Sequence, residues 1–388
     1  MIPAEHRFPC GQCGASLAFR PGQQSLVCDW CGHRQQIGPG PARAPGRHAD
    51  DSSDDTALQW AETKPALPRG LEEIPLEKGL DLYRGAEEIV QTVRTLSCPN
   101  CGAQVDLDDN HHASACPFCA TPVVTDTGPT RRIKPQGVLP FAITEAEARA
   151  AMKAWLGSLW FAPSALTAYA RKDRRLTGVY SPFWTFDADS VSHYRGQRGD
   201  AYYVTVQTMQ NVNGKSQMVS RQERRIRWTP VSGRITRQFN DVLIPASTAL
   251  PPRFAEGMKP WDLSSLAIYD PAFLSGFEAE GYTVALADGH EAARRQMARI
   301  IHQDARRAIG GDEQQVDHVD SRFANETFKH ILLPIWSAAY RYNGKSYRFV
   351  VNGQTGKVMG ERPWSVWKIT GAVALALVAL AAFLYLSQ

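Results

Sequence analysis

Eight cysteines carry the most specific chemistry in this 388-residue sequence, and all of them lie within its first 119 residues. They form four Cys-x-x-Cys pairs, and fourteen residues separate the two pairs of each cluster. Two residues between paired thiolates let both face one ion, and two such pairs complete a tetrahedral site. The predicted metal ligands are Cys10, Cys13, Cys28 and Cys31 in the first cluster and Cys98, Cys101, Cys116 and Cys119 in the second.

Four sulfur ligands in a closed tetrahedron favour zinc, and we expect one structural ion in each cluster. Such a site leaves no open position for a water molecule or a substrate, so neither ion is predicted to be catalytic. Rubredoxin-like iron and redox-active thiol pairs are the alternatives that this spacing leaves open. Residues 1–7 lack the apolar stretch of a signal peptide, which favours a compartment where thiols stay reduced.

A run of arginines is the second group of residues with recognisable chemistry. The run lies within residues 221–237 and is interleaved with apolar side chains, so alternation along a strand would place arginines on one face. Such a face could attract anionic lipid headgroups or the phosphates of a nucleic acid. A solvated sheet face balanced by nearby acids is the alternative. The candidate anion contacts are Arg224, Arg225, Arg227, Arg234 and Arg237.

The sequence lacks the common enzyme motifs. Gly-Lys-Ser occurs twice, but Met209 and Ala339 stand where a phosphate-binding loop has its first glycine. There is no His-Glu-x-x-His and no Gly-x-Ser-x-Gly, and every cysteine belongs to a predicted metal cluster. We therefore expect no enzymatic activity and no catalytic residue. The net charge of +4, from 43 basic and 39 acidic residues, is too small to predict nucleic-acid binding by itself.

An apolar run near the end of the chain predicts a transmembrane helix over residues 367–386. From residue 369 onward the run has no charged side chain, and as a helix it would be about 27 Å long. Trp364 and Trp367 precede it and Tyr385 ends it, where interfacial aromatic rings are common. The nearby basic residues all precede the run, so the positive-inside rule predicts a single-pass protein whose N-terminal bulk is cytoplasmic. A buried helix of a soluble domain is the alternative.

The elements that must position these residues fall into six predicted segments. The stretch between the cysteine clusters is rich in Gly, Pro and Asp and cannot bury enough apolar surface to fold, which would leave the first ribbon on a flexible tether. The segments are zinc ribbon 1 at 1–37, a disordered linker at 38–70, a short helical connector at 71–96, zinc ribbon 2 at 97–130, a duplicated α+β domain at 131–362 and the transmembrane helix at 367–386.

The domain at 131–362 contains a weak internal repeat of strand, helix and further strands. Each copy opens with an apolar strand and a helix cap, formed by Thr144 and Glu147 in the first and by Asp288 and Glu291 in the second. Each then continues through Pro-x-Trp into a hairpin marked by Asn-Gly. The predicted fold class is therefore α+β, with two small four-cysteine ribbons, a duplicated β-rich domain and one C-terminal transmembrane helix.

Together with the ribbons and the apolar terminus, Pro-Phe-Trp-Thr-Phe-Asp at 182–187 and Asn-Gly-Gln-Thr-Gly-Lys-Val at 352–358 carry a family resemblance. From about residue 97 onward the chain resembles largely uncharacterised bacterial membrane-anchored proteins with TFIIB-type zinc ribbons. These proteins are often labelled as like primosomal replication factor Y, a superfamily II helicase. Helicase activity is not expected here, because the nucleotide-binding loop is missing. Relatives are often encoded beside PspA-like and SPFH-domain proteins of the envelope-stress response.

The resemblance implies a location at the bacterial inner membrane and cytoplasmic protein partners, SPFH or PspA-like proteins among them. We accordingly expect a membrane-anchored zinc-ribbon adaptor that recruits cytoplasmic partners and contacts membrane lipid. A membrane-tethered protein that binds nucleic acid through its ribbons is the alternative, although the ribbons themselves contain few Arg and Lys. Binding that weakens steeply with salt would distinguish the second function from the first.

Overall fold

The structure is a computed structural model that describes residues 8–23, 25–37, 58–61, 71–81, 90–98, 100–106, 116, 118–119, 125–159, 176–212, 215–342, 345–361 and 365–386. Its strands form a small sheet of three and a large sheet of thirteen. The small sheet consists of β1 (Leu17–Phe19), β2 (Ser25–Cys28) and β3 (Arg34–Gln36).

The large sheet contains both short and very long strands. The strands of this sheet are β4 (Leu58–Ala61), β5 (Ile74–Pro75), β6 (Val90–Ser97), β7 (Gln104–Asp106), β8 (Thr125–Ile133), β9 (Gly137–Val138), β10 (Thr177–Val212), β11 (Lys215–Pro245), β12 (Ala267–Ile268), β13 (Glu278–Gly281), β14 (Glu313–Tyr342), β15 (Lys345–Asn352) and β16 (Val358–Gly360). The helices are α1 (Leu76–Leu80), α2 (Glu145–Ser158), α4 (Pro252–Gly257), α5 (Leu286–Ile309) and α6 (Val366–Leu386), with 3-10 turns η2 (Leu263–Ser265) and η3 (Pro271–Leu274).

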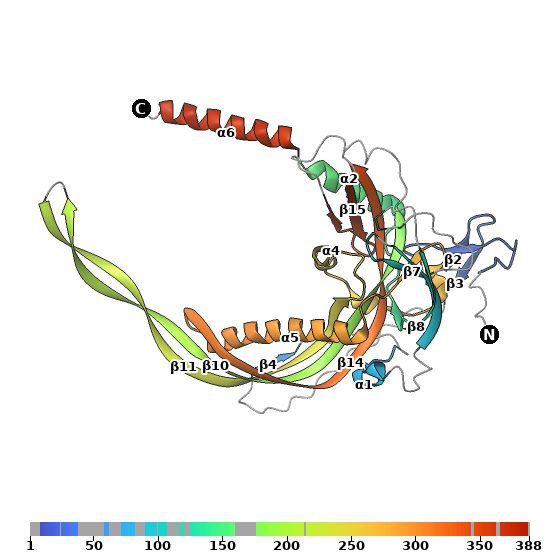
Figure 1. Cartoon of the computed structure of the whole chain (residues 1–388), viewed down its shortest axis with the longest axis horizontal. Coiled ribbons are helices and arrows are strands. Elements are labelled where there is room, and N and C mark those ends of the chain that lie inside the picture. Colours follow the sequence, from blue (N-terminus) through green and yellow to red (C-terminus); the bar gives the residue numbers. More distant parts are fainter. Residues whose placement is uncertain are drawn as a thin grey trace.

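Three long strands, β11, β10 and β14, run antiparallel side by side and curve into a half-barrel (Figure 1). Part of the curvature arises at β-bulges around Asp187, where the register shifts on both sides of β10 and the sheet bends. Helix α5 lies along the concave side (Figure 1). It packs Ala293, Met297 and Ile301 against Phe239 of β11, because apolar residues at helical spacing form one stripe.

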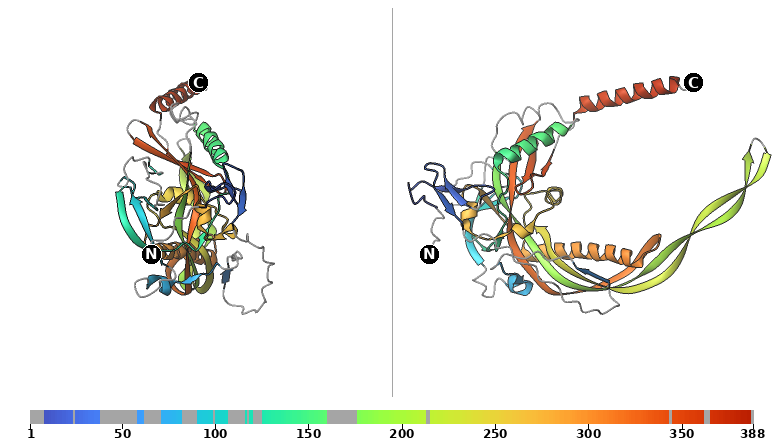
Figure 2. Two further views of the ribbon diagram at one scale, coloured as in Figure 1. Left: turned by 90° about the vertical axis from the view of Figure 1, so that its right-hand side faces the viewer. Right: turned by 180° about the vertical axis from the view of Figure 1, so that it is seen from behind.

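The hairpin of β10 and β11 extends beyond the rest of the sheet. The pairing of β14 with β10 ends where Glu313 faces Gly199, whereas β10 and β11 stay paired out to Val212 and Lys215. Residues 200–212 and 215–227 therefore form a two-stranded projection, called the arm below, which is visible at the right of the right-hand view of Figure 2. The predicted Asn213-Gly214 turn at its tip lies outside the described residues.

The two halves of the domain are arranged about an approximate two-fold axis. Ser181, which precedes Pro182, lies opposite Leu333, which precedes Pro334, so equivalent positions face each other at the centre of the sheet. The short strands are exchanged: β9 of the first half pairs in parallel with β14 of the second, and β13 of the second pairs in parallel with β10 of the first. Each half thus completes the sheet of the other.

The two Pro-x-Trp motifs make reciprocal contacts across this axis. The indole N–H of Trp184 donates to the carbonyl of Val284 at 3.0 Å, and that of Trp336 donates to the carbonyl of Ile143 at 3.2 Å. Both rings are buried, and a buried indole is tolerated where its N–H has an acceptor. The tryptophans therefore fasten the segment before each helix to the opposite half.

The cap prediction is correct for α2 and wrong for α5. In α2, the side chain of Thr144 accepts from the amide of Glu147, and the Glu147 carboxylate accepts from the amide of Thr144 at 2.7 Å. Helix α5 instead begins at Leu286, after Ala285, without a side-chain cap. Leu286 is buried, and its packing places the start of the helix before the cap that the sequence predicts at Asp288.

The structural correspondence between the halves differs accordingly from the predicted one. Gly137 and Glu278 occupy matching positions in β9 and β13, 141 residues apart, and the first residues of α2 and α5 have the same separation. The predicted caps at Thr144 and Asp288 are 144 residues apart. Aligning the sequence on its caps thus misplaces the second half by three residues.

The segments between the ribbons also differ from their predictions. Strand β4, inside the predicted disordered linker, pairs in parallel with residues 235–238 of β11; residues 38–57 and 62–70 lie outside the described ones. Among its described residues, the predicted helical connector is helical only in α1. From Val90 onward it forms β6, because its β-branched residues suit a strand that pairs with β7 and β8. The second ribbon therefore extends beyond 97–130, from residue 90 to residue 133.

Helix α6 is long and apolar enough to span a membrane. Within its 20 residues from Trp367 to Leu386, an 18-residue window has a mean hydropathy of 2.4, and none of that window is buried against the rest of the described chain. Trp367 and Tyr385 are both exposed, whereas Trp364 lies outside the described residues. The C-terminal helix thus has the composition of a membrane span and no packing partner among the described residues.

Candidate metal centres

The four cysteines of the first cluster converge on one point. Their sulfur atoms lie within 4.8 Å of one another, and the Sγ atoms of Cys10 and Cys31, like those of Cys13 and Cys28, are 3.5 Å apart. All four are free thiols, since a disulfide would bring two sulfurs to about 2.0 Å. Four sulfurs about 2.3 Å from one ion would be about 3.8 Å apart. The cluster could therefore hold one tetrahedrally bound metal ion.

The second cluster has the same geometry in a more buried setting. The Sγ atoms of Cys98 and Cys119 are 3.5 Å apart, and those of Cys101 and Cys116 are 3.6 Å apart. Three of these four cysteines are buried, whereas two of the first four are exposed. Both predicted ligand sets are thus brought together by the fold, and each could hold a metal ion.

A glycine closes each of the three knuckles whose turn is described. Gly14, Gly32 and Gly102 have φ angles of +74°, +76° and +73°, a conformation that glycine adopts without strain. The amide of each glycine donates to the carbonyl of the first cysteine in its pair, at 2.8 or 2.9 Å. The sequence pattern Cys-x-x-Cys-Gly therefore specifies the turn that aims both thiols at one point.

Hydrogen bonds within the knuckles favour thiolates at two positions. The backbone amide of Cys31 donates to the sulfur of Cys28 and lowers the pKa of Cys28 to about 7. The thiol of Cys101 donates to the sulfur of Cys116 and lowers the pKa of Cys116 to about 5. Metal ions bind cysteine as thiolate, so these contacts prepare each site for a cation.

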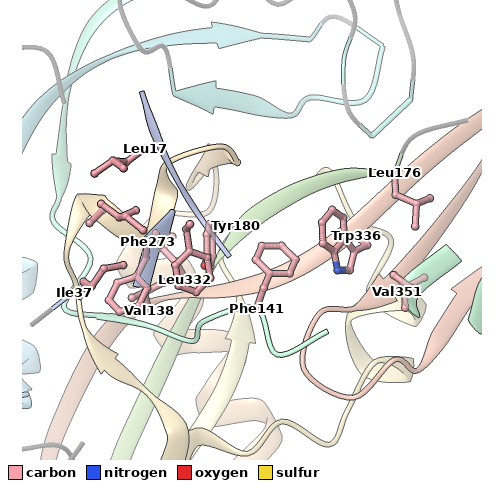
Figure 3. Packing of buried hydrophobic residues seen from close by; sticks show 14 of the residues in the cluster. Leu17, Ile37, Val138, Phe141, Leu176, Tyr180, Phe273, Leu332, Trp336 and Val351 are labelled. Atoms are coloured by element: carbon pink, nitrogen blue, oxygen red, sulfur yellow. The ribbon is translucent and has the colours of Figure 1, made fainter. Parts of the chain in front are cut away.

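The first ribbon is docked on the domain, contrary to the tether that the linker predicts. The amide of Phe19 donates to the carbonyl of Ser275 at 3.0 Å, and the Ser275 hydroxyl donates to the carbonyl of Leu17 at 2.6 Å. The ring of Phe19 meets that of Phe273 edge to face at 5.4 Å. Leu17 and Ile37 belong to the core cluster of the domain (Figure 3). Burial of these side chains stabilises the docked ribbon and fixes the position of the first cluster on the domain.

The second ribbon is built into the large sheet. Its strand β7 pairs with β13. Phe118, which lies between the last two cysteines, is fully buried in a cluster with Leu250, Phe254 and Met258. The second cluster is therefore part of the domain core rather than a separate module.

The predicted anion contacts lie in different surroundings. Arg224, Arg225 and Arg227 belong to the exposed arm, with Arg224 paired to Glu313 at 2.9 Å. Arg234 is exposed nearer the domain. Arg237 is not a surface contact, because it is nearly buried and pairs at 2.7 Å with the fully buried Asp304 of α5.

These arginines do not line one face, as strand alternation alone would suggest. Arg237 points toward α5, where it pairs with Asp304. Because side chains alternate between the two faces of a strand, the even-numbered Arg224 and Arg234 lie on the opposite face of β11. Arg227 stacks over the ring of Tyr202, with its guanidinium carbon 5.3 Å from the ring centre. The arm therefore presents basic side chains on both faces.

Comparison with known proteins adds one distant relative. The chain is 24% identical over 246 residues to the uncharacterized protein YdjG of Bacillus subtilis (strain 168), a match covering 61% of this chain and 66% of the relative. No family model and no solved structure matches the chain. The relative's description names no activity, so function must be argued from the structure.

One exposed residue beside the first cluster was not singled out from the sequence. Trp30 lies between Cys28 and Cys31 with 86% of its surface exposed. A tryptophan between two ligands gives no signal of its exposure, since a short knuckle can point it either way. In the structure β1 packs its buried side chains into the core of the domain, whereas no described residue covers Trp30.

Proposed function

We propose that the chain is a membrane-anchored adaptor, in which two structural zinc ions hold ribbons that present a binding surface to cytoplasmic proteins. The observation that carries the proposal is the exposed Trp30 on a ribbon that is docked rigidly on the domain. Tryptophan is enriched among residues that dominate protein interfaces, and a fixed anchor loses little entropy on binding. The proposal assigns no catalytic step to the chain.

Zinc is the proposed metal because all eight ligands are cysteine sulfurs and both sites are closed. The ions would hold the knuckles together and supply folding energy to the small ribbons. Two zinc ions per purified chain, measured by elemental analysis, are expected. Iron in place of zinc would contradict this assignment without affecting the adaptor function.

The proposed anchor is α6, inserted in the bacterial inner membrane with the ribbons and the domain on the cytoplasmic side. As a helix, the stretch Trp367–Leu386 would be about 30 Å long and would match the hydrocarbon core. Deletion of residues 367–388 should release the protein from the membrane fraction. Retention of the shortened chain there would contradict the anchor.

The partners that the family resemblance suggests, SPFH or PspA-like proteins, belong to this proposal. We also propose that the exchanged strands and reciprocal tryptophans record an internal duplication. The duplicated domain would then act as a rigid platform that sets the distance between the membrane and the first ribbon.

A crosslinking pull-down from bacterial membranes tests the adaptor function. The variant Trp30→Ala should lose at least about tenfold in partner recovery, as expected for a central interface tryptophan. Gln12→Ala is the matched control, because Gln12 is exposed on the neighbouring knuckle. Equal recovery with both variants, at unchanged zinc content, would remove Trp30 as the binding anchor.

A membrane-tethered nucleic-acid-binding protein is the second candidate, favoured by the exposed arginines of the arm. In that case DNA or RNA should copurify, and the binding constant should fall by orders of magnitude between 50 and 200 mM salt, about as expected for six or more phosphate contacts. Zinc-dependent protein partners that survive this increase in salt would favour the adaptor.

A further inference from the structure

The curved sheet leaves two long strand edges free among the described residues. On the outer edge of β14, the partner strands β5, β9 and β15 pair from residue 327 onward, so no described strand lies beside residues 313–326. On the outer edge of β11, β4 covers residues 235–238, and no described strand lies beside residues 215–234. Free edges expose unpaired backbone donors and acceptors and are templates for pairing with another chain.

The free edge of β14 is the shorter of the two, so the free edge of β11 can extend along all of it. The β14 edge spans 14 residues and the β11 edge spans 20, which correspond to about 45 Å and about 65 Å of extended strand. Alternate residues of an antiparallel strand direct their N–H and C=O groups outward. Register shifts against β10 near Asp317 and Asn325 interrupt this alternation on the β14 edge, and Pro230 of β11 has no N–H to donate. The two edges can therefore exchange hydrogen bonds over the regular stretches between these positions.

The two edges carry opposite charge. Residues 313–326 contain four acids and one arginine, a net charge of −3 with His318 neutral, whereas residues 215–234 contain six basic residues and one acid, a net charge of +5. Arg224 and Glu313 already pair with each other within the chain. Asp317 and Asp320 on one edge and Arg221 and Arg234 on the other are exposed and make no ion pair with another described residue.

The arm itself lacks the support that a third strand would give. Two-stranded ribbons are marginally stable alone, and this one exposes Tyr203, Met209 and Met218, with 65%, 73% and 68% of their surfaces accessible. A further strand along β11 would bond its edge and cover part of this apolar surface.

We propose that a second copy of this chain occupies the free β11 edge, with the β14 edge of that copy pairing along residues 215–234. Like edges repel and unlike edges attract, so the contact joins different surfaces on the two copies. Such a contact repeats from copy to copy and yields rows or closed rings rather than a two-fold dimer. The half-barrel sheet then continues from one copy into the next.

Charge reversal on each edge tests the proposal in the full-length protein in lipid nanodiscs or detergent. Arg221→Glu with Arg234→Glu lowers the net charge of the β11 edge from +5 to +1, and Asp317→Lys with Asp320→Lys changes that of the β14 edge from −3 to +1. Each double variant alone should lose roughly tenfold or more in association constant, because attraction becomes repulsion at two positions. Mass photometry or sedimentation measures the sizes.

Mixing the two double variants supplies the decisive result. The glutamates at positions 221 and 234 of one variant then face the lysines at positions 317 and 320 of the other, and the unchanged edges still attract. Assemblies should therefore return to the wild-type size, which also shows that both variants are folded. Arg34→Glu with Lys153→Glu is the matched control, because both residues are exposed and lie on β3 of the first ribbon and on α2, outside the strands of both edges. This control should assemble like the wild type.

A photo-crosslinking residue at position 318 identifies the contact directly, and it should capture residues 215–234 of another copy. A wild-type protein that stays monomeric would overturn the proposal. So would double variants that assemble normally, as they would if α6 alone joined the copies. Failure of the mixture to recover at full zinc content would also overturn it.

Discussion

Replacing Lys329 by methionine should be among the most damaging single changes in the domain. Lys329 is fully buried in β14, and its ammonium lies 2.8 Å from an Asp241 carboxylate oxygen, 3.0 Å from one of Asp187 and 3.4 Å from one of Glu73. The three acids come from β10, β11 and the segment before β5. The lysine therefore holds the bulged part of the half-barrel together and attaches the segment that leads to the second ribbon.

The size of the effect follows from the charges left behind. Without the ammonium, three carboxylates would face one another in a buried site, and burial already raises the pKa of Asp187 to about 6. Removing one partner of a buried ion pair typically costs about 3–5 kcal/mol. For a domain of this size that loss lowers the melting temperature by about 6–20 °C.

Thermal unfolding of the purified full-length protein measures this loss. Lys153→Met is the matched control, because Lys153 is exposed on α2, and it should change stability by less than about 0.5 kcal/mol. Combining Lys329→Met with Asp187→Asn and Asp241→Asn should restore part of the stability, since it removes the uncompensated charge. If Lys329→Met melts within about 2 °C of the control, the buried network does not stabilise the fold as argued.

Two further predictions concern the knuckles and the buried histidine. Gly32→Ala should weaken metal binding by about 1–2 kcal/mol, because φ at this position is +76°, whereas Gly11→Ala should have little effect, and competition with a chelator compares them. Burial lowers the pKa of His330 to about 4, so the folded state takes up this proton less readily than the unfolded state. The stability that neutral His330 contributes is complete above its unfolded pKa of about 6.5 and is lost as the pH falls toward 4. The melting temperature should therefore drop more between pH 7.5 and 5 in the wild type than in His330→Asn, and equal drops would contradict this assignment.

The metal centres could be predicted because their information is local. Each ligand pair lies within four residues, and a glycine that sets the turn follows three of the four pairs, so Gly14, Gly32 and Gly102 could be placed without knowledge of the fold. The apolar run of α6 and the capping box of α2 are local in the same sense. In each case a short stretch of sequence determines its own backbone geometry.

The docking of the first ribbon could not be predicted from the sequence. It depends on Phe19 meeting Phe273, residues more than 250 positions apart, and on backbone bonds to Ser275. The acidic, glycine-rich linker indicated only that its own residues would not form a core. The composition of a connecting segment therefore does not determine whether the module beside it is mobile, because the first ribbon is held by its own contacts with the domain.

The weak internal repeat has a physical cause in the way the halves interlock. Only positions at the two-fold axis, such as Ser181 and Leu333, face their own equivalents. The Pro-x-Trp motifs beside them therefore make the same contacts in both halves. Away from the axis the tasks differ: α2 begins at an exposed cap, whereas α5 begins at a buried leucine beneath the curved sheet. Because β9 and β13 each pair with a long strand of the opposite half, neither half completes its sheet alone. The strand pairing that holds the domain together thus acts between the halves. Each half can therefore differ in its local sequence patterns, such as helix caps, from which secondary structure is predicted.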